Sequence, residues 1–420
     1  MIVAMPTGSS HGWGIAGTYL TQEIYRLPVV EGVALHCMRN PDFAPSSPDS
    51  WERHNIGYCF FEHDIEAYAY TEQAAQRYDH IVAGSSWCEH HLRIGGVKEA
   101  STILQGIDHT LFYPAAARDD DGRFIVFSGG KFELRKGQDV VIAAIKVMME
   151  RHRDVWLACS WHNIWPFSIA TMVDSPLIAF SMGQMSCDQL IARALQQNGV
   201  DLERVIVHPL TPNSGMRQVY ALSDVGLFPN RCEGGNNMVM CEYMACGRGV
   251  IASSWTGHAD VIDEQNSLPL EHFSARLVWK ADKPVAVWFD PELEEVIERL
   301  EYAYQHRDVV KQTGYNAAHS MQQLDWQQAA RSFQALAVKY GVPASEPTPF
   351  TLLRRATRLT ELQDLNGALY QLQQALQLSP LNADIYKALG LVYEAMGKTQ
   401  ESIFCNQKSQ ALESRQQTKG

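Results

Sequence analysis

One segment of the sequence combines two lysines with three glycines, in the run SGGKFELRKG at residues 128–137. The segment follows an apolar run typical of a strand and directly precedes a helical pattern. A helix start offers free N–H groups and the positive end of a dipole, and Gly129 lets an anion approach the backbone closely. Because the dipole alone contributes roughly 0.3 to 1 kcal/mol, Lys131 and Lys136 would supply most of the attraction. We interpret the segment as a diphosphate site, with a solvated charged turn as the alternative.

A second segment places two carboxylates around glycines, in the run FPNRCEGGNNMVMCEYMACG at residues 228–247. It begins at the end of a predicted strand, where open α/β sheets bind ligands, and it continues into a helix. Glu233 can accept hydrogen bonds from sugar hydroxyls, and Glu242 can grip a ribose diol. The neighbours of Glu242 are almost wholly apolar, so its carboxylate needs a partner, and a salt-bridged helix residue is the alternative interpretation. Residues that would complete this site are Gly234, Gly235 and Asn236.

These segments, taken in order with YALSDVGLFPN, GRGVIASS and the pair Gly257-His258, resemble the donor lobe of the retaining glycosyltransferases of family 4. The run YDHIVAGSSWCEHHL is also similar to that family, and the resemblance spans roughly residues 1 to 340. It implies a GT-B fold, in which two Rossmann-like, doubly wound α/β lobes face a cleft. It also implies transfer of a hexose-type sugar from a nucleotide sugar such as a UDP- or GDP-hexose, with no cofactor and no bound metal.

The resemblance carries specific roles to four residues. Lys131 and Lys136 would contact the donor diphosphate, Glu233 the transferred sugar and Glu242 the nucleotide ribose. The family's two glutamates have seven residues between them, whereas this sequence has eight, and the difference bears mainly on Glu233. No nucleophile is assigned.

The run GWGIAG at residues 12–17 formally matches the G-x-G-x-x-G dinucleotide fingerprint. An NAD enzyme would place an acidic ribose ligand near the end of the next strand, where this sequence has Arg39 and Asn40 instead. The resemblance places the same loop, and Gly14 in particular, at the cleft beside the donor.

The FFEHD run places Glu62 and His63 directly after a predicted buried strand. Polar groups there would point into the cleft, where they could orient or deprotonate an acceptor, so both are catalytic candidates together with Glu233. The alternative is a helix N-cap with a surface acid and histidine.

The alternation of short apolar runs with helical stretches predicts two α/β lobes. We place the first at residues 1–118, with a helix from Ala16 to Leu27. The second is placed at residues 119–342, where Gln138–His152, Glu294–Tyr304 and Trp326–Tyr340 are predicted helices.

Residues 349–417 repeat with a period of 34, which is typical of tetratricopeptide (TPR) units. The second unit carries Ser402, Asn406 and Ser409 at packing positions and is degraded. Since about three repeats are needed for an independent solenoid, two would have to pack on the enzyme body or on another chain.

The composition is that of a globular protein, with 46% hydrophobic and 20% charged residues. A net charge of −12 argues against nucleic-acid partners and leaves at most peripheral membrane contact. The sequence shows neither a signal peptide nor a membrane span, and it predicts a cytoplasmic protein. Its nine cysteines form no C-x-x-C pair and predict reduced thiols without zinc.

The resemblance therefore implies a retaining, metal-independent hexosyltransferase that acts on a glycan, lipid-linked or protein acceptor, with polysaccharide biosynthesis as its setting. One alternative is an epimerase or phosphorylase of the GT-B fold, which would use the same phosphate cradle. Another is a non-catalytic TPR adaptor that retains a relict sugar-nucleotide site. The TPR-like tail would bind a protein partner or mediate packing or self-association.

Overall fold

The computed structural model describes residues 1–9, 11–116, 118, 121–163, 165–344 and 347–417. The chain divides into two compact units, each formed by separate stretches of sequence. The first compact unit contains Met1–Cys37, Ser46–Ile56 and Gln327–Gly420, and the second contains Met38–Pro45 and Gly57–Trp326. The domain boundaries predicted near residues 118 and 342 stay a prediction.

The first sheet has five strands in the order β1-β3-β4-β5-β6. β1 pairs parallel with β3, and β5 pairs parallel with β6. Every residue of β3 is buried, as expected for a parallel strand that is covered on both faces. The apolar runs that predicted strands in this part of the sequence are confirmed. The bounds are β1 (Ile2–Ala4), β3 (Val33–Cys37), β4 (His54–Cys59), β5 (His80–Ala83) and β6 (Ala100–Thr102).

Helix α1 (Gly12–Arg26) follows β1 and begins four residues earlier than predicted. The reason is the cap: the Nδ1 atom of His11 accepts a hydrogen bond from the backbone N–H of Gly14 at 2.9 Å. The glycines that suggested a loop therefore lie within the first turn of the helix.

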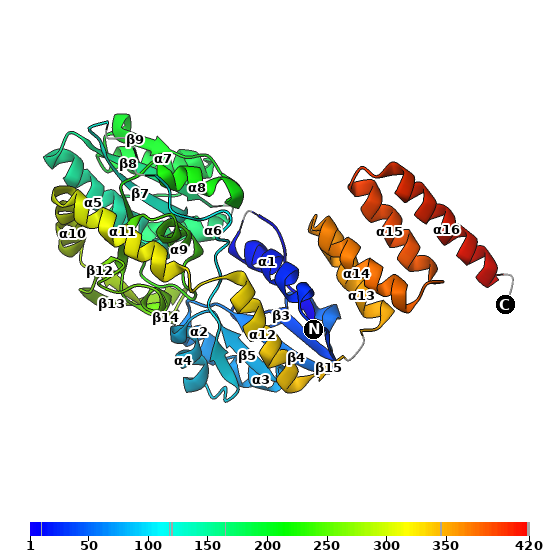
Figure 1. Cartoon of the computed structure of the whole chain (residues 1–420). Coiled ribbons are helices and arrows are strands. Elements are labelled where there is room, and N and C mark those ends of the chain that lie inside the picture. The colour runs from blue at the N-terminus through cyan, green and yellow to red at the C-terminus, as the bar shows by residue number, and fades with distance from the viewer. Residues whose placement is uncertain (10, 117, 119–120, 164, 345–346, 418–420) are drawn as a thin grey trace. The chain divides into compact units, whose positions relative to one another are not determined.

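The second sheet has six strands in the order β12-β11-β10-β7-β8-β9, and its neighbouring strands pair parallel. Figure 1 labels β7, β8, β9 and β12 of this sheet. The order runs outward in both directions from β7, which makes the sheet doubly wound, as predicted. The strands are β7 (Phe124–Lys131), β8 (Val155–His162), β9 (Val205–Val207), β10 (Val225–Phe228), β11 (Gly249–Ser253) and β12 (Leu268–Leu270).

Alternation along β7 builds a separate core on each face of this sheet. Phe124 and Val126 pack with α5 (Gln138–Arg151), α7 (Cys187–Gln197) and α10 (Leu293–Gln305). Ile125 and Phe127 pack on the other face, with the helices α8 (Met216–Ala221), α9 (Met238–Ala245) and α11 (Arg307–Met321). The helices predicted from residues 138 and 294 are confirmed to within a residue or two.

The second compact unit also contains an antiparallel hairpin, β13 (Phe273–Lys280) with β14 (Lys283–Pro291), that the sequence did not predict. The helices α2 (Asp64–Tyr68), α3 (Thr71–Arg77) and α4 (Ser86–Ile94) complete the part of this unit that carries β5 and β6.

The helical tail is part of the first compact unit. After α12 (Trp326–Tyr340), β15 (Val342–Pro343) pairs antiparallel with β2 (Val30–Glu31). Two helix pairs follow, α13 (Pro349–Glu361) with α14 (Leu365–Leu378), and α15 (Ala383–Ala395) with α16 (Thr399–Gln417).

The first helix pair packs on α1. The Nε2 atom of Gln371 donates to the carbonyl of Tyr25 at 2.9 Å, and Arg26 lies 3.5 Å from Asp364. In the second pair, Ser409 donates to the carbonyl of Ala383 at 3.0 Å, so a polar residue at a packing position is satisfied.

All nine cysteines lie in the described residues and are unpaired, and eight are buried, with Cys187 partly exposed. Within the described part of the chain, no helix combines the length and apolar character required to cross a membrane.

Candidate functional site

The two segments that carry the predicted site follow neighbouring strands. β7 and β10 pair parallel, so their carboxyl ends meet at one edge of the second sheet. The loop after β7 leads through a 3-10 turn at Leu134–Lys136 into α5, and the loop after β10 leads into α9. The sheet thus brings Lys136 and Glu233 together across 97 residues of sequence.

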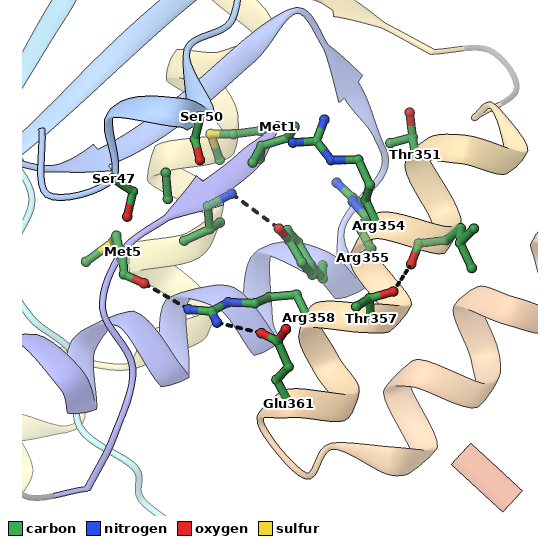
Figure 2. Close-up of a pocket in the computed structure, with 15 residues that line it drawn as sticks. Met1, Met5, Ser47, Ser50, Thr351, Arg354, Arg355, Thr357, Arg358 and Glu361 are labelled. Atoms are coloured by element: carbon green, nitrogen blue, oxygen red, sulfur yellow. Dashed lines mark hydrogen bonds and ion pairs between the residues drawn. The ribbon is translucent and has the colours of Figure 1, made fainter. Parts of the chain in front are cut away.

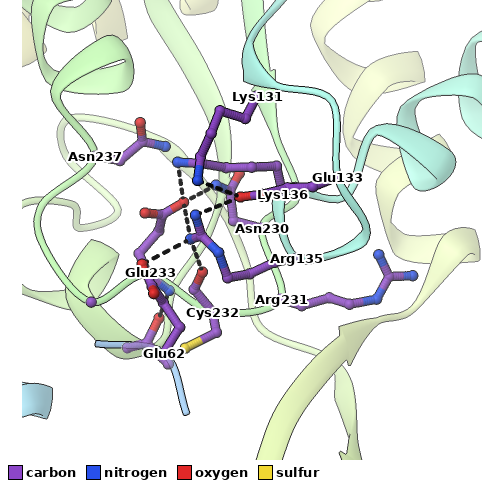
Figure 3. Close-up of polar contacts among 12 residues, drawn as sticks. Glu62, Lys131, Glu133, Arg135, Lys136, Asn230, Arg231, Cys232, Glu233 and Asn237 are labelled. Carbon is purple, nitrogen blue, oxygen red and sulfur yellow. Dashed lines mark hydrogen bonds and ion pairs between the residues drawn. The ribbon is translucent and has the colours of Figure 1, made fainter. Parts of the chain in front are cut away.

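Glu233 is the centre of a buried cluster of charges (Figure 3). Its Oε1 atom lies 2.5 Å from the Nζ atom of Lys136 and 3.2 Å from the Nη1 atom of Arg135, and it also accepts a hydrogen bond from Asn230. Burial opposes ionisation of this carboxyl, but the two cations outweigh burial and hold the pKa of Glu233 at about 2. Glu233 is therefore a fixed anion at neutral pH.

Arg135 connects this cluster to the segment that carries Glu62. Its Nη2 atom is 2.7 Å from Glu133, and its Nη1 atom donates to the carbonyl of Cys232 at 2.8 Å and lies 3.5 Å from Glu62. The side chain is 9% exposed. Arg135 stands within the lysine segment but was not predicted as a site residue, and its position beside Lys136 was the available signal.

Lys131 and Lys136 have different environments. Lys136 is 11% exposed at its side chain, and burial lowers its pKa. Lys131 is 40% exposed, lies 3.4 Å from Glu133 and stands 5.3 Å from the centre of the Trp165 ring. Lys131 is thus the open cation of the pair, while Lys136 is already held by Glu233.

Glu242 lies on α9, 5% exposed and apart from the charged cluster. Its carboxylate accepts hydrogen bonds from the Nδ2 atom of Asn213 at 2.7 Å and from the Tyr220 hydroxyl at 3.0 Å. Both partners are neutral, so burial dominates and raises the pKa of Glu242 to about 7. Asn213 and Tyr220 carried no sequence signal of their own.

Gly234 and Gly235 are packing positions as well as loop residues. A Cβ atom on Gly234 would lie 2.6 Å from the carbonyl oxygen of Phe61, and one on Gly235 would lie 2.7 Å from the Phe60 ring. The Gly234 carbonyl accepts hydrogen bonds from Ser85 at 2.9 Å and from the thiol of Cys88 at 3.1 Å. Only glycine allows the loop after β10 to approach this closely.

Asn236 is 1% exposed and donates from Nδ2 to the carbonyl of Gln105 at 3.0 Å, whereas its Oδ1 atom has no hydrogen-bond partner among the described residues. The next residue, Asn237, has a left-handed backbone with φ of 54° and contacts the Nε2 atom of His258 at 3.0 Å. Burial lowers the pKa of His258 to about 4, so this ring is neutral at pH 7.

Gly129 and Gly130, near the end of β7, have distinct reasons to be glycine. A Cβ atom on Gly129 would lie 2.9 Å from Val239 of α9, and Gly130 has a φ of +112°. Gly137, which precedes α5, has a φ of +73°, and a Cβ atom there would lie 2.1 Å from the carbonyl oxygen of Pro229. These residues keep the two loops in contact.

Glu62 and His63 separate in the structure. Glu62 joins the charged cluster through Arg135, and its carbonyl accepts a hydrogen bond from the indole N–H of Trp288 at 2.7 Å. The Nδ1 atom of His63 lies 3.2 Å from Glu66, and its ring stacks near Trp288. His63 occupies the N-cap position of α2 without a side-chain cap hydrogen bond.

Gly14 belongs to the first compact unit, whereas the other predicted site residues belong to the second. Its amide N–H is already taken by the His11 ring, so it is not a free donor for a phosphate.

Arg231 fixes the loop after β10. Its guanidinium forms two hydrogen bonds with Asp139 at the start of α5, at 2.7 and 2.8 Å, and it also pairs with Asp290 of β14. Its own carbonyl accepts from the N–H of Phe289 at 3.1 Å. The residue is fully buried, and sequence reasoning missed its role.

Comparison with known families identifies two regions. Residues 176–281 match the family described as glycosyl transferases group 1, and residues 357–397 match a TPR repeat. No curated protein matches the chain in sequence.

Several solved structures share the fold. Sucrose-phosphate synthase from Thermosynechococcus elongatus superposes with a TM-score of 0.55 at 17% identity, covering 73% of each chain. A glycosyltransferase from Rickettsia africae ESF-5 gives 0.51 at 14% identity, covering 80% of this chain and 83% of that one. A TarM variant from S. aureus gives 0.52 at 11% identity, covering 75% and 58%.

Residues 176–281 therefore match a group 1 glycosyltransferase domain, the chain shares a GT-B-like fold with solved structures, and a TPR repeat lies near its C-terminus. The resemblance drawn from the sequence is confirmed at this level. Group 1 glycosyltransferases transfer a sugar from a nucleotide sugar, and residues 176–281 carry the match to that class.

Proposed function

We propose that this protein is a retaining, metal-independent hexosyltransferase that holds its nucleotide-sugar donor at the carboxyl ends of β7 and β10. The observation that carries the proposal is the cluster in which Lys136 and Arg135 share Glu233, with Glu242 in a separate buried site on α9. Two cations and two carboxylates at one sheet edge match the chemistry of a donor that carries a diphosphate and two sugars.

The donor diphosphate would bind Lys131 and Lys136. An ammonium group has three N–H donors, and Lys136 uses one toward Glu233, which leaves others for phosphate oxygens. The side chain of Lys131 is 40% exposed and is therefore open to an incoming anion. Gly129 and Gly130 lie where the backbone would face the same phosphates. The two lysines supply the positive charge that a metal ion supplies in other transferases.

Glu233 would contact the transferred sugar as an anion. With its pKa held at about 2, it is a poor proton acceptor at neutral pH, so it would act as a hydrogen-bond acceptor and as a negative charge beside the sugar. Its two cations would also fix its position. Asn236 offers a buried amide oxygen without a partner close to the same loop.

Glu242 would bind the ribose diol. Its pKa of about 7 means that the carboxyl is partly protonated before the donor binds. Hydroxyl donors favour the ionised form of a carboxyl, so donor binding would release a proton. Tyr220 and Asn213 would orient the carboxylate from the opposite side.

Glu62 and His63 are proposed to face the acceptor, which would be a glycan, a lipid-linked sugar or a protein. The TarM structure that shares this fold contains UDP, which supports a nucleotide diphosphate in such a site. The TPR repeat supports an interaction with a protein. A cytoplasmic location and a role in polysaccharide biosynthesis stay parts of the proposal.

The proposal is tested by titrating the protein with UDP-, GDP- and ADP-hexoses and following thermal unfolding. A ligand that binds only the folded state raises Tm, so one nucleotide class should stabilise the wild type and should fail to stabilise Lys136→Ala and Glu242→Ala. Lys146→Ala is the matched control, because Lys146 lies on α5, is 44% exposed and pairs with the exposed Glu150 at 3.9 Å, away from the charged cluster.

If no donor stabilises a folded wild-type protein, the transferase proposal fails and the adaptor becomes the better interpretation. If a donor binds but is turned over without an added acceptor to an isomerised or phosphorolysed product, the epimerase or phosphorylase alternative is correct.

A further inference from the structure

A cavity of about 480 Å³ lies within the first compact unit, between strand β1 and helix α13 (Figure 2). One wall is the start of the chain, from Met1 to Met5, together with Tyr25. The other wall is the face of α13 that carries Arg354, Arg355 and Arg358. The volume falls within the range of small-molecule sites, about 300 to 1,000 Å³.

Two of the three arginines have carboxylate partners. Arg354 lies 3.6 Å from Glu52, and Arg358 lies 2.7 Å from Glu361 and also donates to the carbonyl of Met5 at 3.0 Å. Their side chains are 44% and 29% exposed, so both remain movable.

Arg355 differs from its neighbours because it is 3% exposed and its charge has no carboxylate partner among the described residues. Its Nη1 atom donates to the carbonyl of Leu27 at 3.1 Å, and its guanidinium lies over the Tyr25 ring at 4.9 Å. Its Nε and Nη2 atoms are buried, and no described residue forms a hydrogen bond with them. Burial lowers the pKa of Arg355 to about 10, which still leaves it charged at neutral pH.

A buried cation with an unused pair of donors is costly unless an anion completes it. The Nε and Nη2 edge of a guanidinium presents two parallel N–H groups, which is the fork that a carboxylate or phosphate accepts. Among the side chains that line this cavity, Arg355 therefore has two unused N–H donors that an oxyanion could accept.

We propose that this cavity is a second ligand site, separate from the donor site, and that it binds a small molecule through a phosphate or carboxylate group on Arg355. Because the unused nitrogens are covered, Arg355 has to turn toward the cavity to bind the anion, and Arg354 and Arg358, which line the same cavity, would contact it as well. The apolar side chains of Met1, Val3 and Met5 also line the cavity, so a short apolar part of the ligand could pack against them beside its charged group.

The test is calorimetric titration of the full chain with inorganic phosphate and with succinate, against sodium chloride at equal ionic strength. Since phosphate could also bind the lysines of the donor site, each titration is repeated in Lys131→Ala/Lys136→Ala. We expect one of the two anions to bind in both backgrounds. Arg355→Gln should weaken that binding by about tenfold or more, since it removes a bidentate ionic pair.

Arg331→Gln is the matched control, since Arg331 is an exposed residue of α12 that does not line the cavity, and it should bind like the wild type. Donor-induced stabilisation should survive in Arg355→Gln, which separates this site from the proposed function. Should Arg355→Gln not fold, Arg354→Gln/Arg358→Gln decides, because loss of binding there supports the site and unchanged binding overturns it. Failure of both anions to bind the wild type, or binding that disappears only with the lysines, also overturns the proposal.

Discussion

At the scale of single residues, the donor-site candidates differ mainly in what neutralises them. Glu233 has two cations within 3.2 Å, whereas Glu242 has only a neutral amide and a phenol. Both are buried glutamates, yet the cations hold the pKa of Glu233 at about 2, whereas burial raises the pKa of Glu242 to about 7.

Replacing Glu233 by Gln should destabilise the protein by about 2 to 4 kcal/mol, because it leaves Lys136 and Arg135 buried without their shared carboxylate. The measurement is urea unfolding at neutral pH. Glu150→Gln, on an exposed carboxylate, should change stability by less than about 0.5 kcal/mol. Equal effects of the two changes would contradict the described cluster.

Glu242 should make the protein less stable as pH rises. Its folded pKa of about 7 exceeds the ordinary value of 4.5, so the native state holds this proton more tightly than the unfolded state does. Below pH 4.5 the contribution of Glu242 to the free energy of unfolding is fully present. It falls as pH rises from 4.5 to 7 and is lost above that, so the protein loses about 3 kcal/mol of stability across this interval. The measurement is the free energy of unfolding of wild type and Glu242→Gln as a function of pH, because the difference between them removes the contributions of Glu233 and His258. A difference that does not change with pH would refute the prediction.

Sequence reasoning at this scale identified residues whose types suit the chemistry but not the residues that support them. Lys131, Lys136 and Glu242 stand in recognisable runs. Tyr220 is the one aromatic residue of the short helix α8, and its contact with Glu242 depends on the packing of α8 against α9. No local pattern encodes such a contact.

At the scale of elements, the site depends on two loops that touch each other. Gly137 carries a left-handed backbone against Pro229, and Arg231 ties the same loop to α5 and to β14. The turn after β7 and the turn after β10 therefore behave as one structure.

Gly137→Ala should be more destabilising than Gly96→Ala. Both glycines have positive φ, but a Cβ atom at Gly96 meets nothing within 4 Å, whereas one at Gly137 would lie 2.1 Å from a carbonyl oxygen. The backbone term alone is about 1 to 2 kcal/mol, and displacement of the Pro229 loop adds about 1 to 3 kcal/mol. Thermal unfolding measures both variants, and only Gly137→Ala should also weaken donor binding. Similar losses would show that the loops are not coupled here.

The regular strands and helices could be predicted because their periods are strong, as in β7, whose alternate residues enter two different cores. The β13–β14 hairpin could not be predicted from the sequence. Its turn is Ala281-Asp282, with a positive φ of 52° at alanine, and it lacks the Asn-Gly or Gly signal that marks two-residue turns. Six of the eight β13 residues are exposed and two are half-buried, so burial gave no pattern either.

At the scale of the whole molecule, each compact unit is assembled from separate stretches of sequence. β15 near residue 342 pairs with β2 near residue 30, and the first TPR-like helix pair contacts α1. The sequence pattern predicted units made of consecutive residues, because hydrophobic periodicity indicates local structure only. It cannot indicate that a later strand pairs with an earlier one.

The two helix pairs of the tail should differ in what their removal does. Deletion of α15 and α16 should leave donor affinity and the Tm of the remaining chain nearly unchanged, because the described polar contacts to α1 come from α13 and α14. Deletion of all four helices uncovers α1 and should lower Tm or cause aggregation. Thermal unfolding with and without donor compares the two, and a similar result for both deletions would contradict the described packing.

The distribution of thiols also makes the chain its own probe of local opening. Cys187 is the one partly exposed thiol among nine, and the buried ones lie in β3, β4, β8, α4, α9 and α16, at the C-cap of α9 and in the loop after β10. A thiol reagent should modify a single site in the native protein and all nine in denaturant, without any introduced cysteine. Mass spectrometry of briefly labelled samples would then report the order in which the sheets and the tail open. It would also show whether a bound donor and a bound oxyanion slow the modification of thiols in different regions.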